Sequence, residues 1–139
     1  MAVYPYSDNI TFGENTVTMT LPATQEVEAP GTFGNGANPM LGTFTDPTNF
    51  TVTSLCGALC LQLKGDNQTI TSIEIVDAAG AKLNGTFEAN YNISDGPVLI
   101  KTGDDGTDKV TLSCPAVLTD DAQKFSWCCP LALWPVALR

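Results

Sequence analysis

Apolar and polar residues alternate along most of this chain, and this period of two constrains its fold more than any other feature. In the stretch TVTMTL, Val17, Met19 and Leu21 fall on one side and the intervening threonines fall on the other. Successive side chains of a β-strand point to opposite faces of a sheet, so the pattern predicts a strand with one buried face. No stretch shows a convincing helical period.

Short strands are also expected near Met40–Phe44 and near Phe50–Thr53. Residues 22–40, which precede them, are dense in Pro, Gly and Asn. These residues favour turns over regular structure, so we expect a long loop there.

The clearest element is SLCGALCLQLKGDNQTITSIEIVD, residues 54–77. Apolar and polar residues alternate in both halves of this stretch. Gly65–Gln68, between the halves, consists of residues that favour turns. We therefore predict a β-hairpin. The residues expected in the core are Leu55, Leu59, Leu61, Leu63, Ile73 and Ile75, and Thr71 keeps the same alternation as the two isoleucines.

The later part of the chain continues the pattern. Lys82–Leu83 and Thr86–Ala89 flank Asn84-Gly85, a dipeptide favoured in two-residue hairpin turns, so a second hairpin is expected. Alternation then resumes on both sides of a turn at Gly103–Gly106. Many short strands without helices indicate an antiparallel sandwich or barrel. The later core is expected to contain Val98, Ile100, Val110 and Leu112, while Cys114 keeps the same alternation.

The length and net charge of the chain limit the classes of function that it can have. A chain of 139 residues is long enough for one domain with a real core, and we see no second domain or internal repeat. Its net charge of −9 argues against binding nucleic acid or anionic lipid. There is no histidine, which removes the commonest general base and metal ligand, and we predict neither enzyme activity nor a cofactor.

Targeting and membrane-spanning segments are absent from the sequence as written. The N-terminus has no basic segment followed by an apolar one, so we identify no export signal. No run reaches the roughly 20 apolar residues of a membrane helix, and no direct membrane insertion is expected.

Five cysteines leave two interpretations open. Cys56 and Cys60 lie four residues apart on one predicted strand, roughly 13 Å at ~3.3 Å per residue, so they cannot bridge each other. A bridge from either to Cys114 is possible in an oxidising compartment, but we favour buried free thiols. Cys128 and Cys129 complete the set, and the spacing does not fit a zinc site.

Acidic residues offer two weak candidate sites. The loop TGDDGTDK could bind calcium through Asp104, Asp105 and Asp108, but it lacks the EF-hand spacing, so we favour a solvated turn. Glu74 and Asp77 could form a glycosidase-type pair, but their spacing puts them on opposite faces of a strand.

Sequons and aromatic residues are also ambiguous. Sequons occur at Asn9, Asn49, Asn67, Asn84 and Asn92, and we attribute them to an Asn/Thr-rich composition. The scattered aromatic side chains could form a sugar platform, although we expect core and rim positions. They are Tyr4, Tyr6, Phe12, Phe33, Phe44, Phe50, Phe87 and Tyr91.

Several stretches together resemble the fimbrillin family, the Mfa-like surface lipoproteins of anaerobic Gram-negative bacteria. They are "AVYPYS", "TVTMTLPATQ", "GNGANPMLG", "SLCGALCLQLKG", "TITSIEIVDAAGAKLNGTF" and "KVTLSC", in that order. The resemblance covers nearly all of residues 2–125. It implies an all-β, antiparallel Greek-key sandwich of the transthyretin-like type, as the N-terminal half of a two-domain exported protein. It carries over no catalytic residue.

The last residues depart from that resemblance. Family members usually continue after "LTDDAQKF" with an aliphatic strand, a proline and a second domain, whereas this chain has SWCCPLALWPVALR. Written with common GC-rich codons and read in the neighbouring frame, this tail encodes Phe-Val-Val-Leu-Pro-Ala-Gly-Ala-Leu-Ala-Gly-Gly-Phe-Ala. We therefore divide the chain into a fimbrillin-like domain, residues 1–125, and an atypical apolar tail, residues 126–139. From about Ser126 we favour a one-base frameshift; the alternative is a genuine apolar strand or interface segment, which would be an aggregation liability if exposed.

The resemblance implies a structural or adhesive module on the cell surface or outer membrane, where the intact parent protein would reside. Its partners would be other fimbrial subunits, or host or bacterial surface proteins or glycans, and subunits would join by donating a β-strand. The rival is a glycan-binding sandwich module. The rival predicts an exposed row of aromatic residues beside Asn or Asp, whereas the first predicts an open sheet edge or groove lined by apolar residues.

Overall fold

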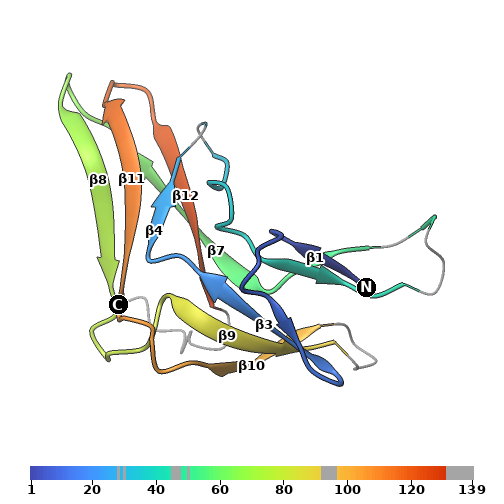
Figure 1. Cartoon of the computed structure of the whole chain (residues 1–139). Helices are drawn as coiled ribbons and strands as arrows, with labels where there is room; N and C mark the ends of the chain where they lie inside the picture. The colour runs from blue at the N-terminus through green and yellow to red at the C-terminus, as the bar shows by residue number, and fades with distance from the viewer. Residues whose placement is uncertain (28, 30, 45–47, 50, 92–96, 131–139) are drawn as a thin grey trace.

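A computed structural model describes residues 1–130 except 28, 30, 45–47, 50 and 92–96. Within these residues the chain is all-β, as predicted (Figure 1). The strands are β1 Ala2–Tyr4, β2 Thr11–Phe12, β3 Thr16–Leu21, β4 Thr24–Glu26, β5 Met40–Gly42, β6 Thr53–Ser54, β7 Cys56–Leu63, β8 Thr69–Val76, β9 Gly85–Asn90, β10 Val98–Thr102, β11 Lys109–Val117 and β12 Gln123–Pro130.

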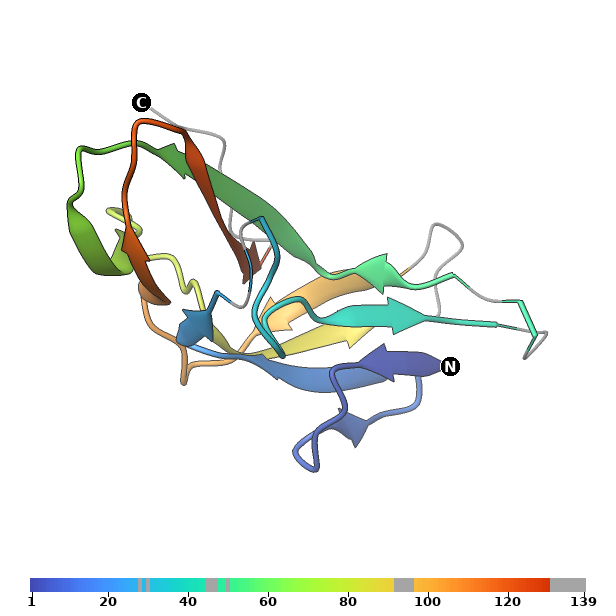
Figure 2. The ribbon, with the colours of Figure 1, turned by 90° about the horizontal axis from the view of Figure 1, so that it is seen from above.

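The strands form four small sheets around two cores. The sheets β1-β5-β6 and β10-β9-β3-β2 enclose the first core, and the sheets β4-β11-β8 and β12-β7 enclose the second. β7 and β12 pair antiparallel over their whole length, and together they run from the first core into the second (Figures 1 and 2). The molecule thus has two cores joined by one long strand pair.

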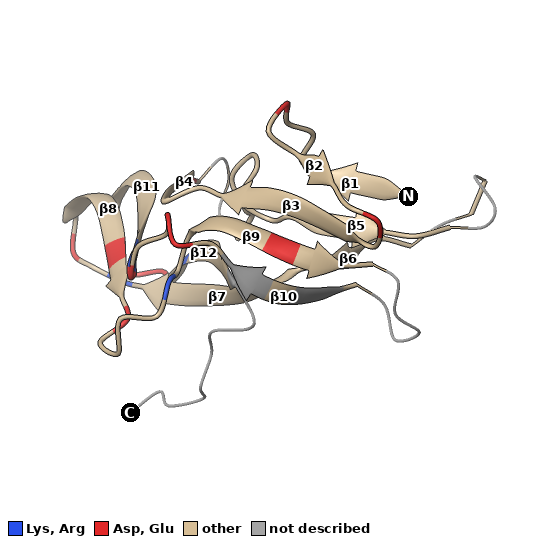
Figure 3. Cartoon of the chain, turned by 60° about the horizontal axis from the view of Figure 1, so that its bottom comes forward, with Lys and Arg blue, Asp and Glu red and all other residues tan. Residues whose placement is uncertain are grey.

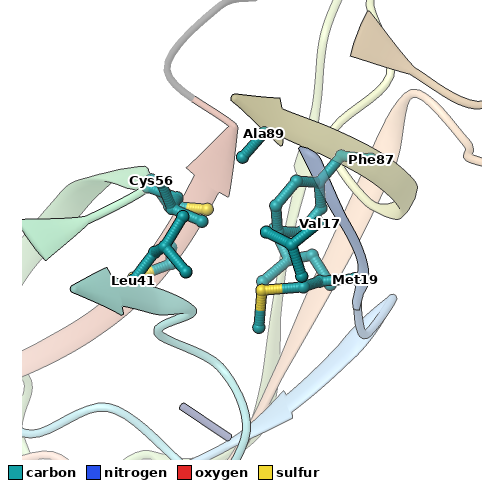
Figure 4. Close-up of a cluster of buried hydrophobic side chains, with 9 residues drawn as sticks. Val17, Met19, Leu41, Cys56, Phe87 and Ala89 are labelled. Carbon is teal, nitrogen blue, oxygen red and sulfur yellow. The ribbon is translucent and has the colours of Figure 1, made fainter. Parts of the chain in front are cut away.

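β3 has the predicted alternation. Val17, Met19 and Leu21 are buried and the intervening threonines are not. In Figure 4, Val17 and Met19 lie with Phe87 of β9 on one side of the first core, across from Leu41 of β5. The short strands predicted near residues 40–44 and 50–53 are confirmed as β5 and β6, although residues 45–47 and 50 lie outside the described residues.

The predicted hairpin of residues 54–77 is wrong, although both of its strands exist. β7 pairs with β12, and β8 pairs with β11, so the turn between β7 and β8 carries the chain from one sheet to the other. The turn between β11 and β12 does the same beside it, and two hydrogen bonds join the turns: Gly65 N to Thr119 O, 3.0 Å, and Leu118 N to Gln68 O, 2.8 Å. Local alternation specifies a strand but not its partner.

The predicted hairpin at Asn84-Gly85 is also wrong. β9 begins at Gly85, which has a φ of 101°, and Lys82–Leu83 lies outside any strand. Asn84 is only 5% exposed, and its side chain bonds to the chain around Thr107 instead of forming a hairpin turn. Asn-Gly is favoured in turns because both residues tolerate positive φ, and here Gly85 uses that freedom at a strand entrance.

The expected loop of residues 22–40 contains a strand. β4 pairs in parallel with β11, with Thr24 opposite Thr111 and Glu26 opposite Ser113. A three-residue strand is too short for periodicity to reveal, and its pairing depends on a strand more than 80 positions away.

Most of the predicted core is confirmed. Leu55, Val110 and Leu112 are buried, and the predicted leucines of β7 and isoleucines of β8 are partly buried against the second core. Ile100 is the exception: it is 51% exposed because the pairing of β10 with β9 shifts register between Leu99 and Lys101. Thr71, which keeps the alternation of Ile73 and Ile75 in the sequence, is exposed. The side chain of Val98 lies outside the described residues.

The division at Ser126 falls inside β12. Phe125, Trp127 and Cys129 face the second core, whereas Cys128 faces the first. A strand buried on both faces has no reason to alternate, which explains the unbroken apolar sequence of this stretch. Residues 126–129 are therefore buried rather than exposed. Residues 131–139 lie outside the described residues.

Candidate functional site

The second core is buried on one side and open on the other. Apart from Ala116, which is partly buried, the inner residues of β11 and β12 are at most 8% exposed, Leu118 after β11 included, whereas those of β7 and β8 are only partly buried. The partly buried aliphatic residues on this open side are Leu59, Leu61 and Leu63 of β7 and Ile70, Ile73 and Ile75 of β8. We call this surface the open side.

The closed side is covered by β4 and the segment after it. β4 pairs with β11 through its backbone and reaches β12 through the side chain of Gln25. Gln25 Nε2 donates to Cys128 O at 2.8 Å, and Cys128 N donates to Gln25 Oε1 at 2.9 Å. Further along, Gly31 N donates to Lys124 O at 3.3 Å. The two sheets are thus joined by hydrogen bonds on this side.

The open side has no such cover within the described residues. β8 is the last strand of its sheet and β7 pairs only with β12, so each has one edge that no described strand covers. An edge strand presents N–H and C=O groups that can pair with another chain. Eight-residue edges beside partly buried aliphatic side chains can accept an extended strand.

Hydrogen bonds to Thr86 and Lys82 hold the acidic loop of residues 103–108 in place. The carboxylate of Asp105 accepts bonds from Thr86 N and Thr86 Oγ1, the latter at 2.7 Å. These bonds hold the pKa of Asp105 below its ordinary value. Lys82 Nζ donates to the carbonyl oxygens of Asp104, at 3.1 Å, and Gly106, at 2.7 Å. The ammonium group of Lys82 therefore binds the backbone carbonyl oxygens that a calcium ion in this loop would use as ligands.

Glu74 and Asp77 each have other partners. Glu74 lies 2.8 Å from Lys109 Nζ in an ion pair that raises the pKa of Lys109. Asp77 Oδ2 accepts from Ala79 N at 3.0 Å and from Ala81 N at 2.7 Å. Each carboxylate is therefore bound to other groups, and the two do not act on one another as a catalytic pair would. Acidic residues lie in several turns and on β8 and β9 (Figure 3).

All five cysteines are free thiols in this structure, and four of them are buried. Cys56 lies in the first core and Cys114 in the second, while Cys60 is exposed, so neither of the bridges considered from the sequence is formed. Burial, with smaller effects from Cys128 and Cys129, raises the pKa of Cys56 to about 12. Burial raises the pKa of Cys128 to about 12 and that of Cys129 to about 11. Such thiols are inert as nucleophiles.

The aromatic residues divide into two groups. Phe87 is buried, and Phe33 and Tyr91 pack against the first core, whereas four others are exposed. The exposed ones are Tyr4, Tyr6, Phe12 and Phe44, with exposed fractions of 43%, 84%, 57% and 37%. Phe50 lies outside the described residues.

The sequons are not equivalent. Asn9, Asn49 and Asn67 are exposed, whereas Asn84 is buried with its amide nitrogen bonded to Thr107 Oγ1 at 2.7 Å. Asn92 lies outside the described residues.

Among the described residues, no group of three or more His, Cys, Asp or Glu side chains is arranged to hold a metal ion. No helix in this part of the chain is long and apolar enough to cross a bilayer.

No model of a protein family matches the chain, and neither a curated protein nor a solved structure does so.

The structural roles of two residues were not predicted from the sequence. Gln25 and Asn84 are polar and lie in stretches that look like loop and turn, yet both are buried. Their sequence offers no periodic signal, because each acts on backbone groups more than 20 positions away. The alternation in the sequence predicts the leucines and isoleucines of the open side. It does not predict that these side chains are only partly buried.

Proposed function

We propose that this chain is a non-enzymatic structural or adhesive module of the fimbrillin type that assembles by β-strand complementation. The observation that carries the proposal is the open side, where two edge strands border a partly buried aliphatic core. A donated strand would pair with the free edge of β7 or β8 and cover these side chains. The partners would be other subunits or surface proteins, and the intact parent protein would sit at the cell surface or outer membrane.

The energetics favour covering this side. Fully burying an exposed aliphatic side chain contributes roughly 1.5–3 kcal/mol. Six aliphatic side chains line the open side, and each is already partly buried. Completing their burial is therefore worth roughly 1–6 kcal/mol in total. Backbone pairing along one edge adds to this.

A second candidate, a glycan-binding module, is favoured by a separate observation at the N-terminal end. Tyr4 and Tyr6 are exposed, and their hydroxyls donate to Asn35 Oδ1, 3.5 Å, and Asp8 Oδ1, 3.1 Å. Aromatic rings beside amide and carboxylate groups suit the apolar face and hydroxyls of a sugar.

Analytical ultracentrifugation of the purified chain tests the first proposal. We expect oligomers whose fraction rises with concentration and falls when a synthetic peptide copying Thr69–Val76 is added in excess. Ile73→Glu, on the open side, should abolish oligomers and peptide binding. Thr71→Glu, on the same strand but exposed, is the matched control and should do neither.

Two outcomes would contradict the proposal. The first is a monomer at all concentrations up to the millimolar range that does not bind the peptide. The second is an identical effect of Ile73→Glu and Thr71→Glu. Micromolar binding on a glycan array that Tyr6→Ala removes would favour the second candidate instead.

A further inference from the structure

A groove of about 210 Å³ lies on the opposite side of the second core from the open side. It sits between β11 and β12, beyond the end of β4. Most of its lining is apolar, with two polar side chains at one end. The lining residues are Val27, Ala29, Cys114, Pro115, Ala116, Gln123, Lys124 and Phe125.

A β-bulge in β11 creates this groove. The pairing with β8 shifts between Ser113 and Ala116, so that Cys114 and Pro115 together oppose one residue of β8. A bulge bends its strand and increases the local twist. Proline has no N–H to leave unpaired, so Pro115 is suited to this position.

β4 leaves β11 at the same place. Among the described residues, the last backbone hydrogen bond from this segment to β11 is that from Val27 N to Ser113 O, at 3.0 Å, whereas β11 continues to Val117. The groove is therefore a continuation of the line of β4 along β11. An extended chain placed there would follow the direction of an existing strand.

The size of the groove suits one large apolar side chain. A cavity of about 150 Å³ lined by aliphatic and aromatic groups binds benzene. A groove of 210 Å³ can thus take a leucine or phenylalanine side chain. Val27, Ala116 and Phe125 would contact it.

Lys124 is the one charged residue among the described residues that line the groove, in a chain whose net charge is −9. Lys124 is exposed and, among the described residues, its ammonium group has no ion pair or hydrogen bond. Lys109 and Lys82, by comparison, are bound to Glu74 and to loop carbonyls. Gln123 is also engaged, because its Nε2 donates to Val117 O at 2.9 Å. Lys124 is therefore the group available for an anion.

We propose that this groove binds an extended, acidic peptide segment of a partner protein. One branched or aromatic side chain of the segment enters the groove, and a carboxylate two residues away pairs with Lys124. Side chains at i and i+2 of an extended chain lie on the same face, so both contacts can form together. This site is separate from the open side and does not depend on the strand-complementation proposal.

The test uses the ¹⁵N-labelled full chain and three acetylated, amidated peptides: Thr-Leu-Thr-Asp-Thr, Thr-Ser-Thr-Asp-Thr and Thr-Leu-Thr-Lys-Thr. We expect the first to shift the amide signals of Val27, Ala29, Ala116 and Lys124 in a saturable way. The serine peptide should bind at least about tenfold more weakly, because the buried side chain is lost. The lysine peptide should bind about three- to tenfold more weakly.

Variants of the chain separate this site from its surroundings. Ala29→Trp fills the groove from an exposed position, and Lys124→Glu reverses its charge, so each should reduce binding of the leucine–aspartate peptide several-fold. Lys64→Glu makes the same charge change on an exposed lysine that does not line the groove, and it should leave binding unchanged. Retained amide dispersion in each variant shows that it is folded.

Three results would overturn the proposal: no saturable shifts at millimolar peptide, equal binding of the three peptides, or shifts confined to β7 and β8. The last would place the peptide on the open side.

Discussion

The side-chain amide of Gln25 occupies the edge of β12 at Cys128 as a neighbouring strand would. It donates to the carbonyl of Cys128 and accepts from its amide, over 2.8 Å and 2.9 Å, in a site where both residues are at most 2% exposed. One glutamine therefore supplies a pair of strand-like hydrogen bonds between two sheets. It closes the side of the second core that lies opposite the open side.

Replacing Gln25 with leucine should lower the free energy of unfolding by about 2–4 kcal/mol, since a buried N–H and a buried C=O both lose their partners. Urea denaturation followed by far-UV circular dichroism measures this. Gln62→Leu, at an exposed position of β7, is the control and should change stability by less than about 0.5 kcal/mol. Equal stability of the two variants would show that the Gln25 bonds do not join the sheets.

Side-chain hydrogen bonds of Asn84 connect the start of β9 to Thr107, in the loop before β11, and to Lys109, the first residue of β11. Asn84 Nδ2 donates to Thr107 Oγ1 and to Lys109 O, and Asn84 Oδ1 accepts from Thr107 N. Asn84→Ala should destabilise the chain by about 2 kcal/mol, because these bonds are largely buried. Asn9→Ala, in an exposed turn, should be nearly neutral. Thermal unfolding of both variants at matched concentration tests the difference, and a neutral Asn84→Ala would contradict it.

Asp105 should make stability depend on pH in the acid range. Its pKa in the folded chain lies below its ordinary value of 3.8 because Thr86 donates to its carboxylate. A lowered pKa means that the stabilisation is fully present above about pH 3.8 and is lost as the pH falls through the lower folded-state value. Asp105→Asn should lack this dependence.

Two measurements test the role of Asp105. Carboxyl NMR titration should place its folded-state pKa below 3.8, and urea midpoints at several pH values should converge between wild type and Asp105→Asn as the pH falls. Asp104→Asn, in the same turn, is the matched control. A normal pKa for Asp105 would contradict the hydrogen-bonded loop.

The sequence predicts strands better than their partners. Val17, Met19 and Leu21 alternate with threonines, and period-two alternation is a local property that survives into the structure. The pairing of β7 with β12 depends instead on contacts between residues 60 to 74 positions apart, and a turn of favourable composition connects two different sheets. The same limit explains why Asn84-Gly85 looked like a hairpin turn.

The candidate sites were predictable to a lesser degree. The aliphatic residues of the open side follow from alternation, but their partial exposure depends on which strand edges remain uncovered. The groove arises from a bulge at Cys114 and Pro115, and neither residue interrupts the alternation enough to reveal it. Because β12 is buried on both faces, residues Trp127 to Cys129 do not alternate between apolar and polar. From the sequence alone, we therefore treated that stretch as atypical.

Cys60 should be the one thiol that reacts in the folded chain. It is exposed on β7, whereas the other four cysteines are buried, and burial raises the pKa of each of those four. Since the thiolate is the reactive form, brief treatment with N-ethylmaleimide at neutral pH should add one label per chain, and mass spectrometry should place it on Cys60. Cys60→Ser should take up none until urea unfolds it, when the remaining four react. Rapid labelling of Cys114 in native buffer would contradict this, and it would mean that the groove floor opens far more readily than its 2% exposure indicates.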